Sequence, residues 1–128
     1  MKRQLRSRSG TTMVEFALTL PLLALLLFAI IQWGFLFAAH ITVRNASAVG
    51  ARYYAIHPTN PGGAIALAKG SLSPMLVNSG STATPSNPTV GGEPAYGMTV
   101  TYDLPLIIPF VVPGGGSTKT LTSTTVTR

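Results

Sequence analysis

Residues 16–39 read FALTLPLLALLLFAIIQWGFLFAA, a run of 24 residues without a charged side chain. A helix rises about 1.5 Å per residue, so this run would be about 36 Å long, enough to cross the hydrocarbon core of a bilayer. The alternative is the core helix of a soluble protein, but the rest of a 128-residue chain supplies too little apolar surface to surround it. We therefore expect one membrane-spanning helix.

Basic residues precede this run in a cluster, and those that follow it are scattered singly. A positive cluster on one side of a spanning helix predicts that this side faces the cytoplasm, with everything after the span outside it. The scattered residues form no basic face of the kind that binds nucleic acid. The cluster consists of Lys2, Arg3, Arg6 and Arg8.

A cleaved secretory signal is the obvious rival interpretation, because residues 46–48 read Ala-Ser-Ala and offer an A-x-A cleavage site. The apolar region of such a signal is usually about 7–15 residues long, and the whole signal about 15–30. The apolar run here is longer, and the site lies at position 48. We favour a retained anchor over a secreted domain released after Ala48.

One carboxylate, Glu15, stands directly before the apolar run. A charge in the apolar region of a membrane costs roughly 2.5–3.5 kcal/mol, so such a residue usually has a partner or a task. If a peptidase cut after Gly10, the new amine of Thr11 would lie about one helical turn from Glu15, where opposite charges can offset each other within or between subunits. The alternative is that Glu15 simply suits the positive end of the helix dipole.

These features together resemble a known signal and a known family. A basic leader ending in Gly10, with Glu15 at the fifth following position and then an apolar helix, resembles the type IV prepilin (class III) signal. The stretches VEFAL at 14–18 and LPLL at 20–23, followed by RNASAVGARY at 44–53, resemble TadE-like proteins of the tight-adherence (Flp) pilus system. Threonine at the first mature position departs from other prepilins.

The resemblance implies a minor pilin-like assembly protein, or pseudopilin, of the bacterial inner membrane. A prepilin peptidase would cut between Gly10 and Thr11, and Glu15 would act in processing or assembly. The implied partners are the membrane, the peptidase, other pilins or pseudopilins and the pilus assembly platform; no nucleic acid, small-molecule substrate or cofactor is implied. TadE-like and TadF-like proteins look alike at this level. The alternative from another class is an uncleaved, membrane-anchored extracytoplasmic binding module.

The chain offers little material for catalysis. It has no cysteine, and its glycine pairs lack the Lys and Ser/Thr of a phosphate-binding loop. No pair of the remaining acid, base or ligand candidates stands at the spacing of a metal or nucleophile motif, so we expect no catalytic residue, no metal site and no enzyme. Those candidates are Glu15, Glu93, Asp103, His40 and His57.

The expected organisation is a leader at 1–10, a transmembrane helix at 11–40 and an extracytoplasmic part at 41–128. The spanning helix should continue as an amphipathic stalk to about Tyr54 and end before Pro58 and the Pro-Gly-Gly group at 61–63. A second, shorter helix is expected over 63–76. The apolar face of the stalk should comprise Ile41, Val43, Ala46, Val49, Tyr53 and Ile56.

Beyond the helices the apolar period changes from helical to two. The Ser, Thr, Pro and Gly-rich segment 79–92 is expected to be a loop, whereas 96–103 alternates and 119–127 is a second strand candidate. An antiparallel hairpin packed on the stalk is the simplest outcome, because two strands are marginal alone. The apolar run 104–113 either folds back over the small core or forms an exposed patch, and we favour the former. The predicted fold class is α+β.

Overall fold

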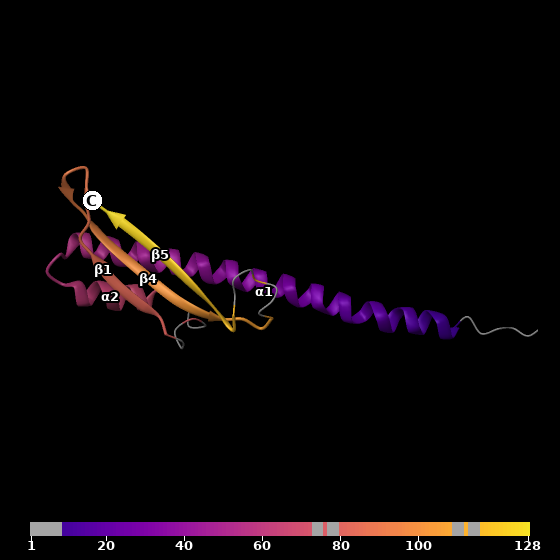
Figure 1. Cartoon of the computed structure of the whole chain (residues 1–128). Helices are drawn as coiled ribbons and strands as arrows, with labels where there is room; N and C mark the ends of the chain where they lie inside the picture. Colours follow the sequence, from indigo (N-terminus) through magenta and orange to yellow (C-terminus); the bar gives the residue numbers. More distant parts are fainter. Residues whose placement is uncertain (1–8, 73–75, 77–79, 109–111, 113–115) are drawn as a thin grey trace, which may run out of the picture.

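The computed structural model describes residues 9–72, 76, 80–108, 112 and 116–128, so the basic cluster of the leader lies outside the described residues. Its architecture is α+β, as predicted. One helix of 48 residues runs through the molecule, and its C-terminal half carries all the other elements (Figure 1). The elements follow in the order α1 (Ser9–Ile56), α2 (Pro61–Gly70), β1 (Thr82–Ser86), β2 (Thr89–Val90), β3 (Glu93–Pro94), β4 (Tyr96–Pro105) and β5 (Thr118–Thr127).

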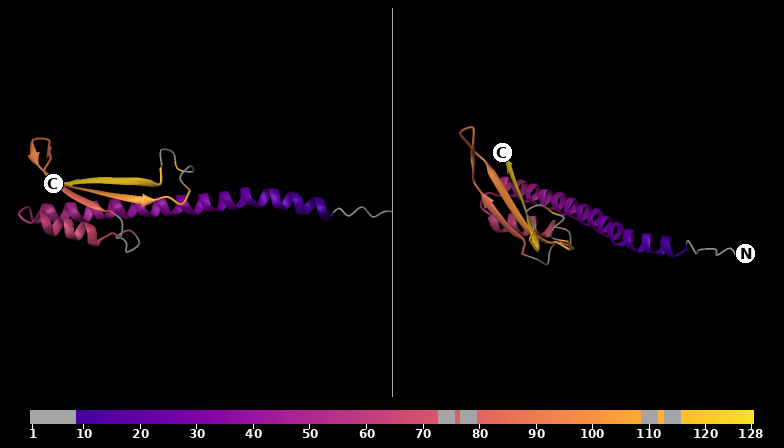
Figure 2. Two further views of the ribbon diagram at one scale, coloured as in Figure 1. Left: turned by 60° about the horizontal axis from the view of Figure 1, so that its bottom comes forward. Right: turned by 45° about the vertical axis from the view of Figure 1, so that its right-hand side comes forward.

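The main sheet has three antiparallel strands in the order β1-β4-β5 and lies along the C-terminal half of α1 (Figure 2). In its register Val100 of β4 pairs with Ala83 of β1 and with Ser123 of β5. The predicted strands at 96–103 and 119–127 are confirmed as β4 and β5. The observed sheet therefore contains the predicted hairpin and one further strand, β1.

The expectation of a loop over 79–92 was wrong, because this segment contains β1 and half of a small β2-β3 hairpin. Pro85 has no N–H for a ladder bond, but β1 is an edge strand, where proline is tolerated. Gly91 and Gly92 have φ values of 65° and 86°, the left-handed conformation that a two-residue hairpin turn requires. Turn residues in this segment thus mark one tight turn rather than a long loop.

Strand β4 supplies the centre of the core. Its side chains alternate between the helix and the outside, as a strand with one covered face does. The residues on the covered face are almost fully buried and belong to the same apolar cluster as α1 and α2. They are Met98, Val100, Tyr102 and Leu104.

The face of α1 under the sheet is lined mainly by small residues, which let the strands lie close to the helix axis. Ala39, Val43, Ala46, Ala51 and Tyr54 are buried there. The predicted stalk face was only partly right: Val43 and Ala46 are buried, but Ile41 and Ile56 are 59% and 73% exposed. The predicted face consists mostly of large residues, whereas alanines make up most of the observed one.

Helix α2 starts earlier than predicted, because Pro61 begins the helix rather than only ending the previous one. Proline suits the first helical turn, and the Asn60 side-chain oxygen accepts a hydrogen bond of 2.9 Å from the Gly63 N–H as an N-cap. The helix ends at Gly70, so its predicted extension to 76 was wrong. Leu72 and Leu76 are nevertheless buried in the core beyond the helix.

The Ala-Ser-Ala sequence at 46–48 lies within the C-terminal part of α1. Ala46 and Ser47 are fully buried, and the Ser47 hydroxyl is 3.0 Å from that of Ser123 and 2.8 Å from that of Thr125 on β5. Cleavage after Ala48 would therefore remove part of the core on which the sheet lies. This packing argues against a secreted domain released at that point.

Candidate functional site

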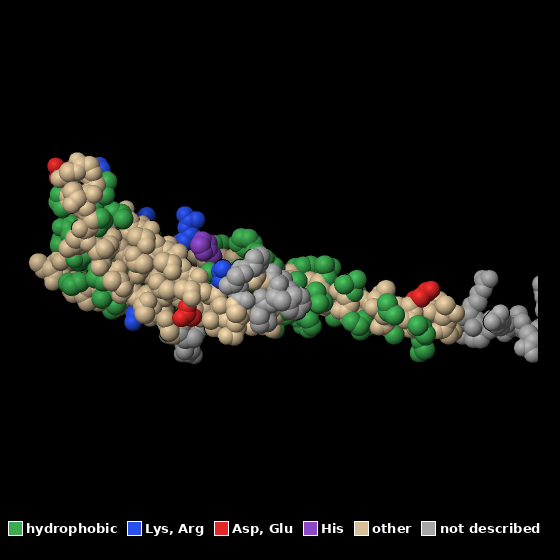
Figure 3. All heavy atoms as spheres, viewed as in Figure 1, with side chains coloured by type: hydrophobic (Ala, Val, Ile, Leu, Met, Phe, Trp, Pro, Cys, Tyr) green, Lys and Arg blue, Asp and Glu red, His purple; other side chains and the backbone are tan. Residues whose placement is uncertain are grey.

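The N-terminal half of α1 extends beyond the sheet (Figure 3), and its large apolar side chains are exposed. The helix is long and apolar enough to cross a membrane once, and none of its most apolar window is buried inside the protein. Pro21 lies inside the helix without ending it, and the Thr19 hydroxyl donates to the carbonyl oxygens of Glu15 and Phe16 within the preceding turn. The Thr19 hydroxyl is thus satisfied within the helix, as a lipid environment demands.

The predicted processing junction lies at the first turn of this helix. Gly10 and Thr11 are both exposed, and a Cβ at Gly10 would meet nothing within 4 Å. The peptide groups of a first turn have the fewest intrahelical hydrogen bonds, and helix ends fray most readily. The bond between Gly10 and Thr11 is therefore accessible from solvent, although nothing in the fold requires a glycine there.

Glu15 follows Thr11 by one helical turn and is exposed. Residues four apart on a helix lie on the same face, about 6 Å apart along the axis. If Thr11 became the N-terminus, its amine and the Glu15 carboxylate would face the same side of α1. The helix thus places the three predicted residues at one end of the apolar segment.

The motif at 44–53 has a packing explanation. Gly50 lies against both α2 and β4, since a Cβ there would be 2.9 Å from the Ala68 Cβ and 2.9 Å from the Met98 Cγ. Ala46 and Ala51 are buried on either side of it, whereas Arg52 points to solvent. The small residues of the motif are therefore the positions at which the rest of the domain docks on α1.

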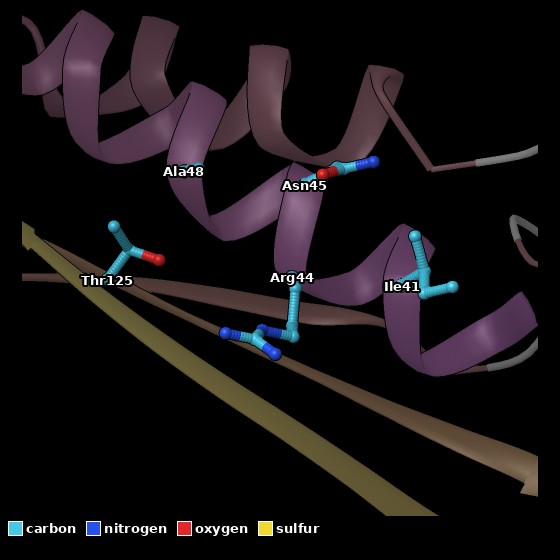
Figure 4. A pocket seen from close by; sticks show the side chains of 5 residues that line it. All are labelled: Ile41, Arg44, Asn45, Ala48 and Thr125. Carbon is cyan, nitrogen blue, oxygen red and sulfur yellow. The ribbon is translucent and has the colours of Figure 1, made fainter. Parts of the chain in front are cut away.

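A shallow pocket of about 370 Å³ lies between α1 and β5 (Figure 4). The side chains of Arg44 and Thr125 extend into the space between the helix and the strand, and Asn45, Ile41 and Ala48 complete the lining. A guanidinium, an amide and a hydroxyl provide neither a general base nor a metal ligand set. The pocket therefore gives no geometric support for catalysis.

The other polar candidates are dispersed. Within the described residues, no three His, Asp or Glu side chains come together as a metal site would require. His57 is exposed after the end of α1, where its ring stacks on Tyr53 at 4.4 Å, and Asp103 accepts a 2.6 Å hydrogen bond from the Thr120 hydroxyl across the sheet. His40 and Glu93 are exposed.

Sequence reasoning missed one contact inside the apolar run. Gln32 is only 4% exposed, and its side-chain amide pairs with both backbone groups of Ile108. The signal was present: Gln32 continues, at helical spacing, the buried face that runs through Leu36, Ala39 and Val43. Of the apolar run 104–113, Leu104 is buried in the core and Ile108 contacts α1, but Pro105 and Ile107 are exposed, so the expected folding over the core is only partly seen. Residues 109–111 and 113 lie outside the described residues.

Comparison with protein families gives one match. Residues 10–52 match the family model described as TadE-like protein. Comparisons with curated proteins and with solved structures gave no match. The match begins at the predicted junction, covers the apolar segment and ends within the motif around Gly50, but it does not include the sheet. Residues 10–52, which form most of α1, are therefore a TadE-like segment of the kind found in the tight-adherence pilus system.

Proposed function

We propose that the protein is a pseudopilin, a minor pilin-like assembly protein of a tight-adherence pilus, and not an enzyme. The observation that carries this proposal is the TadE-like helix α1, whose apolar half projects uncovered from a small domain. In a pilin-like subunit such a helix has two roles: it holds the subunit in the membrane before assembly, and it packs against other subunits afterwards. Its partners are the membrane, other pilins or pseudopilins and the assembly platform.

Processing by a prepilin peptidase between Gly10 and Thr11 is part of the proposal. The basic leader then stays in the cytoplasm, the domain of 41–128 lies in the periplasm, and the inner membrane holds the helix between them. Support comes from the position of the junction at the exposed start of α1 and from Glu15 one turn later. After cleavage, the Thr11 amine and the Glu15 carboxylate can offset each other's charge within one subunit or between neighbours.

A Gly10→Val substitution tests the proposal. A Cβ at this position meets nothing within 4 Å, so the fold should tolerate the change, and a loss of processing would point to recognition by the peptidase. Gly34→Val is the matched control, because Gly34 is also a helical glycine with open space around it. We expect Gly10→Val to abolish processing and pilus formation, whereas Gly34→Val is still cut.

The alternative function, an uncleaved binding module anchored by α1, makes the opposite prediction. Pili and binding at wild-type levels in an unprocessed Gly10→Val protein would exclude the pseudopilin proposal and favour this alternative.

A further inference from the structure

The loop after β4 is attached to the membrane helix at a defined depth. The Gln32 Nε2 donates to the Ile108 carbonyl oxygen at 2.9 Å, and the Ile108 N–H donates to the Gln32 Oε1 at 2.7 Å. An unpaired amide in an apolar environment costs roughly 2–7 kcal/mol, so each partner satisfies the other. This Gln32–Ile108 pair fixes the height of residues 104–108 along α1.

If α1 spans a bilayer, Gln32 lies within the hydrocarbon core, near its outer boundary. Gln32 is about 24 Å beyond Phe16 along the helix axis, whereas the hydrocarbon core of a bilayer is about 30 Å thick. If the core begins at Phe16, just after the charged Glu15, its outer boundary falls near Phe35. A tilt of about 20°, which is usual for spanning helices, would place Gln32 still deeper.

The segment 104–108 has the chemistry that this depth requires. It reads LPLII and carries no polar side chain. Its backbone is paired where it turns: the Leu106 N–H donates to the Ser117 carbonyl oxygen at 3.0 Å, and both polar groups of Ile108 bond to Gln32. An unpaired backbone group costs several kcal/mol in lipid, and these three bonds satisfy the Leu106 N–H and both polar groups of Ile108.

The same segment also presents apolar surface outward. Ile107 is 77% exposed, and the other residues of the segment are also apolar. A groove of about 280 Å³ separates Pro105 and Ile107 from Ile31 and Phe35 of α1, and nearly all of its lining is apolar. The groove is continuous with the uncovered face of the spanning helix, so the occupant of that face also reaches the groove.

We propose that residues 104–108, held by Gln32, enter the extracytoplasmic leaflet, where Ile107 and the groove contact lipid acyl chains. This inference rests on the part of the proposed function in which α1 spans the membrane. The domain is then seated against the bilayer at two points, the helix and this segment, rather than swinging on a single helix. Lipid, not a second copy of the chain, is the committed occupant, because the segment is fixed at lipid depth.

Tryptophan quenching by brominated lipid tests this proposal on the full-length chain. The chain has a single tryptophan, Trp33, which lies in the span, so the wild-type protein serves as the reference for a tryptophan in lipid. The test protein carries Trp33→Phe with Ile107→Trp, and the matched control carries Trp33→Phe with Thr122→Trp on the outer face of β5. Each is reconstituted in phosphatidylcholine vesicles brominated near the head-group end of the acyl chain.

We expect the tryptophan at 107 to lose fluorescence to a similar extent as Trp33, and the tryptophan at 122 to lose none. Quenching of Trp33 without quenching at 107 overturns the proposal and leaves the spanning helix intact. If neither Trp33 nor the tryptophan at 107 is quenched, the claim that α1 spans the membrane is wrong as well. If the tryptophan at 107 is protected from quenching and this protection disappears only on dilution into excess lipid, a second copy of the chain occupies the site. The proposal of lipid contact is then wrong.

A second variant tests the attachment. Gln32→Leu leaves the polar groups of Ile108 unpaired, so the segment should leave the leaflet. In the protein with tryptophan at 107, this substitution should reduce the quenching. In the protein that keeps Trp33, the same substitution should leave the quenching of Trp33 unchanged. Unchanged quenching at 107 would show that Gln32 does not hold the segment at this depth.

Discussion

Gly50 is the residue at which α1 lies against both α2 and β4, so it tests the packing of the domain. In Gly50→Ala the new Cβ would be 2.9 Å from both the Ala68 Cβ and the Met98 Cγ. Overpacking of this kind costs about 1–3 kcal/mol, and we expect that loss in the free energy of unfolding of the detergent-solubilised protein.

Gly70→Ala is the control for this change, because a Cβ at Gly70 meets nothing within 4 Å. Its stability should equal or exceed that of the wild type, since alanine is the better helix former by about 1 kcal/mol. Equal stabilities of the Gly50 and Gly70 variants would show that α1 does not approach α2 and β4 as described.

Glu15 makes a different prediction, because its side chain is exposed and serves no packing role in the monomer. The proposed charge pair with the Thr11 amine forms only after cleavage. Glu15→Gln should therefore still be processed but should form fewer pili, whereas Glu15→Asp, which keeps the charge, should retain more. Counting pili by electron microscopy alongside the mass of the subunit separates the two steps. Wild-type pili in Glu15→Gln would disprove the role of this carboxylate.

At the scale of elements, the start of α2 depends on Asn60. Its side-chain oxygen accepts the Gly63 N–H, and its amide lies 3.4 Å from the Tyr53 hydroxyl at the end of α1. Asn60→Ala should lower the free energy of unfolding by about 1 kcal/mol, and Asn60→Asp should restore most of it. Thermal unfolding followed by circular dichroism measures both, with the exposed neighbour variant Thr59→Ala as the control. A loss in Thr59→Ala as large as in Asn60→Ala would contradict the capping role.

The sequence predicts those elements whose own side chains carry a signal, either a long apolar run or a regular alternation. The uncharged run predicts α1, and the alternation through Met98, Val100 and Tyr102 predicts β4. Strand β1 has no such pattern: Thr82 and Pro85 resemble loop residues, and only Ala83 packs against the core. That strand exists because β4 offers it ladder hydrogen bonds, which are not visible in its own composition.

The candidate site divides in the same way. The junction at Gly10, Thr11 and Glu15 is local in sequence, so spacing alone could predict it. The pairing of Gln32 with Ile108 joins residues 76 positions apart, and no local period links them. A polar residue on the buried face of an apolar helix indicates that a partner exists, but only the fold identifies it.

At the scale of the whole molecule, the proposal requires the two ends of the chain to lie on opposite sides of the membrane. The chain has no cysteine, so single cysteines introduced as Ser7→Cys and Thr122→Cys report each side separately. A maleimide that cannot cross membranes should label position 122 in intact spheroplasts, but should label position 7 of unprocessed protein only after permeabilisation. Labelling of position 7 in intact cells would contradict the cytoplasmic leader.

The whole account depends on what α1 does at its start: it either remains attached to its basic leader or becomes the N-terminus of a pilin-like subunit. Intact mass and N-terminal sequencing of the membrane-purified protein, from cells with and without the prepilin peptidase, measure this directly. The account predicts a chain that starts at Thr11 only when the peptidase is present. A chain that starts at Met1 in both cells, or one that starts at Val49, would contradict it.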